Sequence, residues 1–295
     1  MLFTPGNRPD LIAKAIKSGT DAVIIDLEDA VPAESKDEAR AGLSELPSSP
    51  VPLYVRVNAG DVDVTFEDVI AAGRSGVAGV VVPKAEDPGL VHEIDGVLTA
   101  VERLDGRERG VTGIVPLIES AVGVLNTYDM AAASGRVECV MFGSGEQGDL
   151  VADLGVEWTP DGVGLNHARS SVLLAARAAG IEQPMDAVFM DFRNLEALRL
   201  ECELARRTGY VGKVAIHPGQ LAVIHEVFTP EPAVVAEQRR IVAEFDKALA
   251  EGSAAISIDG RLVDYAVIRV ARNVIARAEA AERASQRAEQ EESSG

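Results

Sequence analysis

Aromatic and basic residues are both scarce in this chain of 295 residues. Phe, Trp and Tyr together make up 4%, and 28 Lys and Arg against 47 Asp and Glu give a formal net charge of −19 at pH 7. Proteins that bind nucleic acid need a cationic surface, and those that bind single strands add stacking rings. The composition therefore argues against a general DNA or RNA partner, although a local cluster of Arg and Lys can still bind one small anion.

Cysteine is also nearly absent, with two residues in the whole chain. Cys139 lies in a strand-like run and Cys202 in a helix-like run, so we expect small core residues rather than a disulfide or a metal site. No apolar run reaches the length of a membrane span, and no signal-peptide pattern opens the chain. These absences predict a soluble, cytoplasmic protein with no membrane partner.

Most catalytic signature motifs are missing too: there is no Walker loop, no zinc motif and no Gly-x-Ser-x-Gly elbow. The segment GSGEQG (143–148) does match the GxGxxG pattern of dinucleotide-binding loops. It follows the sixth strand-like run rather than opening a first βαβ unit, and no second strand ending in an acid follows at the required distance. We therefore interpret its glycines as a tight turn that lets Asp149 or Glu146 reach a metal ion.

Apolar residues are plentiful, at 47% of the chain, and many fall into short β-branched runs separated by helix-like segments. Eight strand-like runs alternate with eight helix-like segments, and the runs are 2–6, 21–29, 52–58, 79–86, 113–120, 137–143, 186–191 and 212–220. This alternation predicts an α/β fold, specifically a (β/α)8 TIM barrel. An open doubly wound sheet is the alternative, because it alternates the same elements.

The alternation stops after residue 228, which we expect to end the barrel domain (1–228). Residues 229–282 are predicted to form a helical C-terminal extension, which covers the barrel mouth as a lid or contacts a neighbouring subunit. Residues 283–295 are polar and acidic, which predicts a disordered tail.

Chemically useful side chains gather where the predicted strands end, which is the catalytic face of such a barrel. In chain order they are Pro5 and Gly6, Asp26, Glu28 and Asp29, Arg56 and Asn58, Lys84 and Glu86, Glu119, residues 143–149, Asp191 and His217. The strand interiors, by contrast, are almost wholly apolar.

Two of these acids follow neighbouring strands. Glu119 lies at the end of the fifth strand-like run, and Asp149 follows the sixth. Carboxylates at the ends of adjacent parallel strands point into one space, and oxygen ligands of this kind suit a hard divalent cation. The sequence therefore predicts a metal site between these two strand ends.

Arg56 has two interpretations. A buried arginine needs a carboxylate, and Asp26 or Glu28 could supply it. Alternatively, its planar fork binds the carboxylate of a substrate, which we favour because its strand end faces the predicted site. Glu28 and Asp29 are open in the same way, either as functional groups or as structural support for the loops.

Lys84 and His217 are also ambiguous. Lys84 follows a proline at a strand end, so it either contacts a phosphate or carboxylate or is a solvated loop residue. His217 precedes Pro218 and Gly219, and we expect it to orient that loop rather than to act as an acid or base.

The sequence resembles the citrate lyase beta-subunit-like proteins of the HpcH/HpaI aldolase and malyl-CoA lyase group. The resemblance extends from Leu2 to Val267 and rests on the stretches LFTPGNRPD, KAIKSGTDAVIIDLEDAVPAESKDEAR, YVRVN, VVPKAED, PLIESAVGVLN, DLVADLG, GKVAIHPGQ and DGRLVDYAV. It implies a (β/α)8 barrel that assembles as a trimer or hexamer and uses Mg²⁺ to make or break a carbon–carbon bond in a CoA thioester.

The resemblance also implies roles for individual residues. Glu119 and Asp149 match the metal ligands, Arg56 matches the group that holds the oxo- or hydroxy-acid, and Asp264 matches a lid carboxylate that can reach a neighbouring subunit's site. The opening motif near the CoA or substrate pocket comprises Phe3, Thr4, Pro5, Arg8 and Lys14. The link between Phe142 and Asp149 is longer here than in the family, which allows Glu146 to compete with Asp149 for the metal.

From this we expect a Mg²⁺-dependent lyase acting on a β-hydroxyacyl-CoA of the malyl, citramalyl or citryl type. Asp264 is the candidate acid/base, with Glu28 or Asp29 as second choices. Two alternatives remain: an aldolase acting on free keto or hydroxy acids, and a citrate lyase beta-type subunit that needs an acyl-carrier protein partner.

Overall fold

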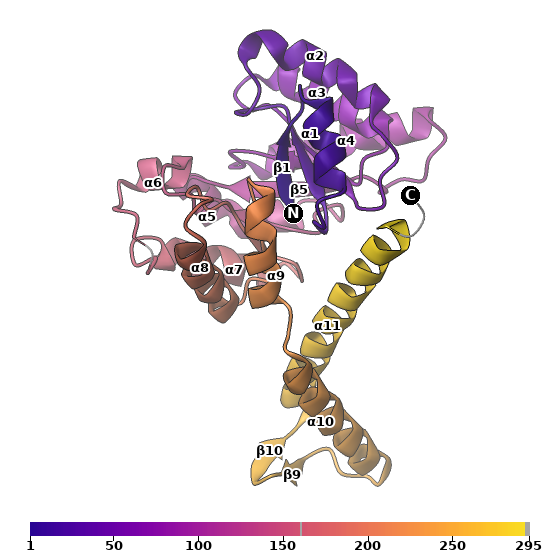
Figure 1. Cartoon of the computed structure of the whole chain (residues 1–295), viewed down its shortest axis with the longest axis vertical. Helices are drawn as coiled ribbons and strands as arrows, with labels where there is room; N and C mark the ends of the chain where they lie inside the picture. The colour runs from indigo at the N-terminus through magenta and orange to yellow at the C-terminus, as the bar shows by residue number, and fades with distance from the viewer. Residues whose placement is uncertain (160, 293–295) are drawn as a thin grey trace. The chain divides into compact units, whose positions relative to one another are not determined.

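The computed structural model of the chain describes residues 1–159 and 161–292 (Figure 1). The chain divides into two compact units, Met1–Ile224 and His225–Gly295. The division falls within helix α9 (Leu221–Phe228), whereas the sequence places the boundary at the end of that helix. The two units are described in turn.

The first unit is built on an eight-stranded sheet in which every strand is parallel to its neighbours, in the order β1 to β8. The strands are β1 (Leu2–Pro5), β2 (Val23–Asp26), β3 (Leu53–Arg56), β4 (Gly79–Val82), β5 (Gly113–Ile118), β6 (Met141–Phe142), β7 (Met185–Asp186) and β8 (Gly212–Lys213). A parallel bridge between Leu2 and Ala215 joins the last strand region to the first. The expected (β/α)8 barrel is therefore confirmed, and the open sheet is excluded.

Helices connect these strands, as the alternation predicts. They are α1 (Pro9–Ile16), α2 (Lys36–Gly42), α3 (Val62–Ser75), α4 (Pro88–Leu104), α5 (Ala121–Ala132), α6 (Asp149–Leu154), α7 (Asn166–Ala178), α8 (Leu195–Thr208) and α9, with 3-10 turns η1 (Ala33–Ser35), η2 (Leu43–Glu45) and η3 (Pro218–Gln220). Local capping sets the start of α4: Pro88 occupies its first turn, and the Asp87 carboxylate accepts the N–H of Gly89 at 2.8 Å. The short helix α6 was not expected.

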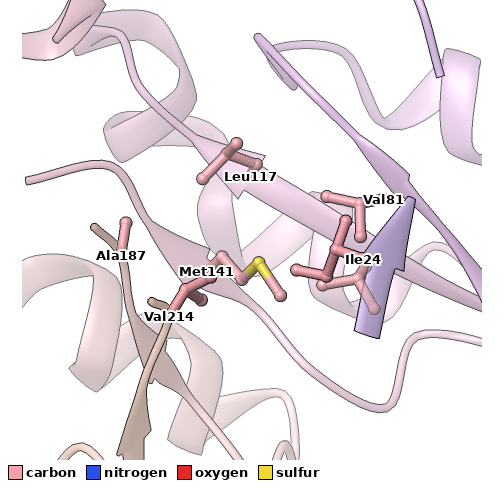
Figure 2. Close-up of a cluster of buried hydrophobic side chains, with 7 residues drawn as sticks. Ile24, Val81, Leu117, Met141, Ala187 and Val214 are labelled. Carbon is pink, nitrogen blue, oxygen red and sulfur yellow. The ribbon is translucent and has the colours of Figure 1, made fainter. Parts of the chain in front are cut away.

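The barrel interior is filled by one apolar cluster, with a side chain from most of the strands. Its buried members are Ile24, Val81, Val115, Leu117, Met141, Ala187 and Val214 (Figure 2). Side chains alternate between the two faces of a strand, so residues two positions further on share the inward face. Asp26 follows Ile24 in this way, and Glu119 follows Leu117. The same alternation that fills the core therefore carries two acids to the carboxyl end of the barrel.

The opposite face of β7 and β8 carries buried charges, which corrects the expectation that the strands are almost wholly apolar. Asp186 and Lys213 are partners in register, and their side chains form an ion pair of 2.7 Å. Arg169 of α7 also contacts Asp186 at 2.7 Å, and Glu201 of α8 lies 3.1 Å from Lys213. Burial alone would raise the pKa of Asp186, but Lys213 and Arg169 outweigh it and hold that pKa below its usual value. These four residues join the sheet to two helices.

The second unit contains α10 (Pro232–Ala250), a hairpin of β9 (Ile256–Ile258) and β10 (Arg261–Val263), and α11 (Tyr265–Glu292). It has a core of its own, made of Phe245, Ile258, Val263 and Ile268. The helices agree with the sequence prediction. The hairpin is not part of the predicted helical extension, although Asp259-Gly260 is a strong hairpin signal and both residues take the positive φ that such turns need.

Helix α11 continues to Glu292, through most of the segment predicted as a disordered tail (283–295), and the disorder of that tail stays a prediction. Ala, Glu, Gln and Arg dominate residues 283–292, and these are strong helix formers that extend a helix once it has begun. Residues 293–295 lie outside the described part of the chain. Within the described residues, none of the helices combines the length and the apolar character that crossing a membrane requires.

Replacing Asp186 by Ala should destabilise the protein strongly. Lys213 and Arg169 would then be buried without their shared carboxylate, and we expect a loss of about 3–5 kcal/mol in the free energy of unfolding. Urea unfolding followed by circular dichroism would measure it. Asp10→Ala, which removes an exposed ion pair with Arg8, is the matched control and should cost less than about 1 kcal/mol. Equal stabilities for the two variants would contradict this account.

Candidate active site

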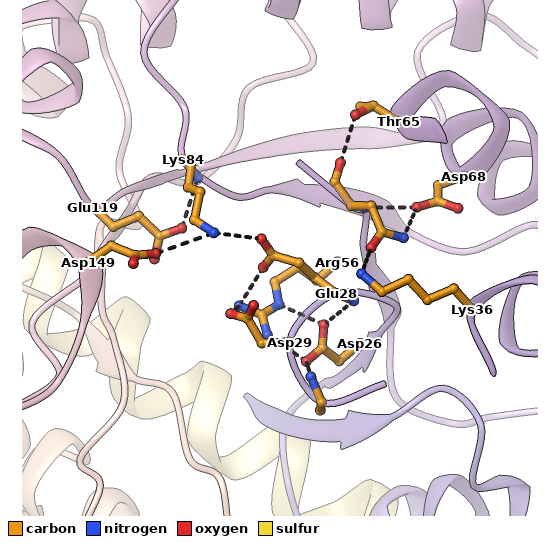
Figure 3. A network of polar contacts seen from close by, with 12 residues as sticks. Asp26, Glu28, Asp29, Lys36, Arg56, Thr65, Asp68, Lys84, Glu119 and Asp149 are labelled. Atoms are coloured by element: carbon orange, nitrogen blue, oxygen red, sulfur yellow. Dashed lines mark hydrogen bonds and ion pairs between the residues drawn. The ribbon is translucent and has the colours of Figure 1, made fainter. Parts of the chain in front are cut away.

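An ion pair between neighbouring strands forms one half of the site. Asp26 and Arg56 end β2 and β3 and are partners in register. The guanidinium binds the carboxylate through two contacts, Nε to Oδ1 at 2.7 Å and Nη2 to Oδ2 at 2.5 Å (Figure 3). Asp26 also accepts the backbone N–H groups of Glu28 and Ala30. Arg56 therefore does pair with a nearby acid, as the first of its two interpretations expects.

The remaining nitrogen of Arg56 faces the other acids of the same loop. Nη1 lies 3.0 Å from Glu28 Oε2 and 3.4 Å from Asp29 Oδ2. The guanidinium also lies 4.8 Å from the centre of the Phe3 ring, a cation–π distance. The pKa of Arg56 is raised, because its carboxylate partners outweigh its burial. A substrate carboxylate at Arg56 would have to share Nη1 with Glu28 and Asp29.

Glu119 forms the second half of the site, directly after β5. Its Oε1 accepts the backbone N–H of Lys84 at 2.8 Å. Burial is the main cause that raises the pKa of Glu119 to about 7, and the nearby carboxylates of Glu28 and Asp149 add to it. Gly143 makes room for this acid, because a Cβ atom there would lie 2.7 Å from the Cβ of Glu119. The sequence did not reveal this role of the glycine.

Lys84 connects the two halves. Its ammonium lies 3.2 Å from Glu28 Oε1 and 3.5 Å from Asp149 Oδ2, and Figure 3 shows it between these acids. Burial raises the pKa of Glu28, and the charges of Arg56 and Lys84 oppose that rise. Lys84 lies in the exposed turn after β4, and its side chain is 44% exposed while it contacts Glu28 and Asp149, so both interpretations of this lysine describe part of what is seen.

Asp149 is held at the start of α6 by the loop before it. Gly148 donates its N–H to the Gly145 carbonyl at 2.9 Å, which closes the tight turn expected from the glycines. The buried Ser144 hydroxyl donates to Asp186 Oδ1 at 3.2 Å, and its carbonyl accepts the Trp158 indole N–H at 3.1 Å. The loop is thereby anchored to the buried charges of β7. Glu146, the predicted competitor of Asp149, is exposed.

The donor set at Glu119 and Asp149 fits magnesium. Within residues 1–159 and 161–292 there is no group of three or more His, Cys, Asp or Glu arranged to enclose a metal. Mg²⁺ does not need such a cage, because it commonly binds one or two carboxylates and fills the other positions with water and substrate oxygens. The two acids could therefore hold a magnesium ion that also contacts the substrate.

The residues expected from the opening motif lie partly inside the barrel and partly on its surface. Phe3 reaches Arg56 from the barrel interior, while Thr4, its neighbour on β1, is buried. Pro5 ends the strand, and its carbonyl accepts the N–H of Arg8 at 3.1 Å. The side chains of Arg8 and Lys14 are exposed, and both pair with the carboxylate of Asp10, as the salt bridges of α1 show.

His217 orients a loop, as predicted. Its Nδ1 accepts the N–H of Gly219 at 3.0 Å, and the Gln220 side chain completes a capping box at η3. The imidazole also stacks on Phe192, with ring centres 4.7 Å apart. Asp264 belongs to the second unit, where its carboxylate accepts the N–H groups of residues 266 and 267 at the start of α11. Its role as a lid acid stays a prediction.

The sequence missed the acid that holds the end of β3. Asp68, which is fully buried on α3, accepts the backbone and side-chain N–H groups of Asn58 at 2.8 and 2.7 Å. Arg40 contacts Asp68 at 2.6 Å, and Lys36 donates to the Asn58 side chain. A signal was available, because helical spacing places Asp68 on the buried face of α3 with Thr65.

The fold and the site together define a class: a (β/α)8 barrel enzyme with a cluster of carboxylates, an arginine and a lysine at the carboxyl ends of its strands. The chain belongs to the HpcH/HpaI aldolase/citrate lyase family, whose sequence profile matches residues 1–218. This confirms the resemblance found in the sequence motifs.

Individual relatives agree with this assignment. The chain is 34% identical over 304 residues to the L-malyl-CoA/beta-methylmalyl-CoA lyase of Rhodobacter capsulatus, covering 95% of this chain and 94% of that protein. It is 35% identical over 283 residues to the citrate lyase subunit beta of Escherichia coli K12, covering 95% and 92%. The crystal structure of CitE from Mycobacterium tuberculosis in complex with magnesium, acetoacetate and coenzyme A is similar with a TM-score of 0.73 and 32% identity, covering 94% of this chain and 97% of that one.

Glu119→Gln should change how stability depends on pH. In the wild type a pKa near 7, against 4.5 for an ordinary glutamate, means that the folded state holds a proton that the unfolded state has lost. Stability contributed by this proton is present below about pH 4.5 and is lost as pH rises through 7. The glutamine is neutral throughout, so the variant should gain up to about 3 kcal/mol relative to wild type between pH 5 and pH 8.

Urea unfolding at both pH values in EDTA would measure this difference. Glu93→Gln, an exposed glutamate on α4, is the control and should show the same pH dependence as wild type. A relative stability of Glu119→Gln that does not change with pH would show that the Glu119 carboxyl titrates normally.

Proposed function

We propose that this chain is a Mg²⁺-dependent carbon–carbon lyase that cleaves or forms a β-hydroxyacyl-CoA of the malyl, citramalyl or citryl type. One observation carries the proposal: the acids after β5 and β6, Glu119 and Asp149, both contact Lys84, beside the Arg56–Glu28 pair. A metal carboxylate pair and a guanidinium at one strand edge suit a substrate that offers a carboxylate and an adjacent oxygen.

Magnesium bound by Glu119 and Asp149 would supply Lewis-acid polarisation of the keto oxygen. Arg56 would hold the substrate carboxylate through Nη1, since Asp26 already occupies its other two nitrogens. The fixed Asp26–Arg56 pair would keep the guanidinium plane in one orientation and so align the acid.

In cleavage, a base removes the hydroxyl proton, the carbon–carbon bond breaks, and its electron pair passes to the thioester fragment as an enolate. Protonation of that enolate gives acetyl-CoA, and the other product is a keto acid. In condensation a base takes a proton from acetyl-CoA and the enolate attacks the keto acid. Asp264 is our candidate for this acid/base, with Glu28 or Asp29 as second choices.

The relatives support the substrate class. One bears the name of a malyl-CoA lyase, and the CitE crystal holds magnesium, a keto acid and coenzyme A together. From them we infer a CoA thioester or keto acid as the ligand, with Phe3, Thr4, Pro5, Arg8, Lys14 and Lys84 as candidates for its binding surface. We further propose a cytoplasmic homo-oligomer, a trimer or hexamer, in which Asp264 of one subunit reaches the site of another.

A second candidate function follows from the citrate lyase beta subunits, which match this chain as well as the CoA lyase does. A subunit of that type would act on an acyl-carrier protein thioester and need partner chains. The free-acid aldolase stays a third possibility, because magnesium and Arg56 would serve it equally.

The deciding assay measures acetyl-CoA release from malyl-, citramalyl- and citryl-CoA, with Mg²⁺ and with EDTA. We expect EDTA-sensitive release from one thioester and a loss of at least about a hundredfold in turnover for Glu119→Gln and Asp149→Asn. Glu93→Gln should keep wild-type turnover. Full activity in both site variants would refute the metal assignment, whereas release only with a carrier-protein thioester would favour the partner-dependent subunit.

A further inference from the structure

The backbone of Lys84 is unusual. Among the described non-glycine residues, Lys84 and Asp259 have a positive φ, at 49° and 51°. For Asp259 the hairpin turn explains it, since such turns require that conformation. Lys84 instead follows the parallel strand β4, where no hairpin demands a left-handed residue. A side chain with a Cβ is strained there, so its presence points to a specific use of the lysine.

The backbone N–H and the side-chain ammonium of Lys84 both contact acids of the site. The left-handed turn aims the backbone N–H at Glu119 Oε1, at 2.8 Å. The side chain carries its ammonium to Glu28 Oε1 at 3.2 Å and to Asp149 Oδ2 at 3.5 Å. One residue therefore contacts three acids that follow three different strands, β2, β5 and β6.

Arg56, the other cation of the site, pairs with Asp26, Glu28 and Asp29. Its two contacts to Asp26 leave one nitrogen, which faces Glu28 and Asp29. Lys84 is thus the cation that lies against Asp149, and it would be the nearest positive charge to a metal ion held by the same carboxylate. Like charges at such a distance repel, although water screens part of this repulsion because the side chains of Lys84 and Asp149 are 44% and 54% exposed.

On the basis of the proposed function, we propose that Lys84 is a positioning residue that sets the metal affinity of the Glu119–Asp149 pair. Its N–H orients Glu119, while its ammonium competes with a divalent cation for Asp149. Glu28 supplies a second partner, so the ammonium keeps an ion pair when the cation takes Asp149. When a metal ion binds Asp149, it therefore replaces the Lys84 ammonium at that carboxylate, and the ammonium keeps its ion pair with Glu28.

Lys84→Met tests this directly. Methionine keeps a long unbranched side chain and the backbone N–H that contacts Glu119, but it removes the positive charge. The measurement is Mn²⁺ binding to the full chain without substrate, followed by electron paramagnetic resonance of the free ion. We expect Lys84→Met to bind Mn²⁺ about tenfold more tightly than wild type, and Lys84→Arg to stay within about threefold of it. Lys17→Met, which removes an exposed lysine at the end of α1, is the control and should leave the affinity unchanged.

A second variant tests the exchange. Glu28→Gln removes the alternative partner of the ammonium, so Lys84 should hold Asp149 more firmly and weaken Mn²⁺ binding about tenfold. In the Lys84→Met background the same change should have a clearly smaller effect.

The outcomes are distinct. Unchanged or weaker Mn²⁺ binding by Lys84→Met, or an equal effect of Glu28→Gln in both backgrounds, would overturn the role of Lys84 and leave the lyase proposal in place. Absence of Mn²⁺ binding by the wild type would overturn the metal site itself, and this inference with it.

Discussion

The Asp26–Arg56 ion pair is the interaction on which the site depends. It lies across the ends of β2 and β3, with two contacts that fix the guanidinium plane. Without a partner, a guanidinium that is mostly enclosed would be costly, and with this partner it becomes a fixed element of the barrel. Glu28 pairs with Nη1 of Arg56, which Asp26 does not contact, and Lys84 pairs with the other oxygen of Glu28. The order of charges across the mouth of the barrel follows from this first pair.

Alternation along the strands explains why core and site are continuous. Inward positions are apolar in the middle of the barrel and polar two residues later, as Ile24 and Asp26 illustrate on β2. The barrel closes, so every strand delivers its end residue to the same rim. The acids there are partly shielded from water, which is why burial dominates the raised pKa of Glu119. A single geometric rule therefore produces both the packing of the unit and the electrostatics of its chemistry.

Much of this architecture was predictable from the sequence, but the pairings were not. Strand-like runs and the helix-like segments between them are local signals, so the barrel could be predicted from their alternation. The partners of Arg56 depend on strand register and rotamer, and the sequence left Asp26, Glu28 and a substrate as open choices. The left-handed turn at Lys84 has no sequence signature, because lysine is not a residue that favours it. The run 186–191 predicts a strand but not the buried ion pair of Asp186, since nothing local tells which face of the strand an acid occupies.

The buried charges of β7 and β8 have a consequence for how this chain can change over evolutionary time. Asp186 and Glu201 balance Lys213 and Arg169, so the set is neutral as a whole and unbalanced after any one loss. Replacing these four residues by apolar ones, one at a time, would give intermediates with a buried charge that has no partner. Substitutions in the exposed loops meet no such barrier. Ser144 connects this set to the loop that bears Asp149. Diversification of substrate preference should thus proceed through the rim, while the outward face of these two strands resists stepwise replacement.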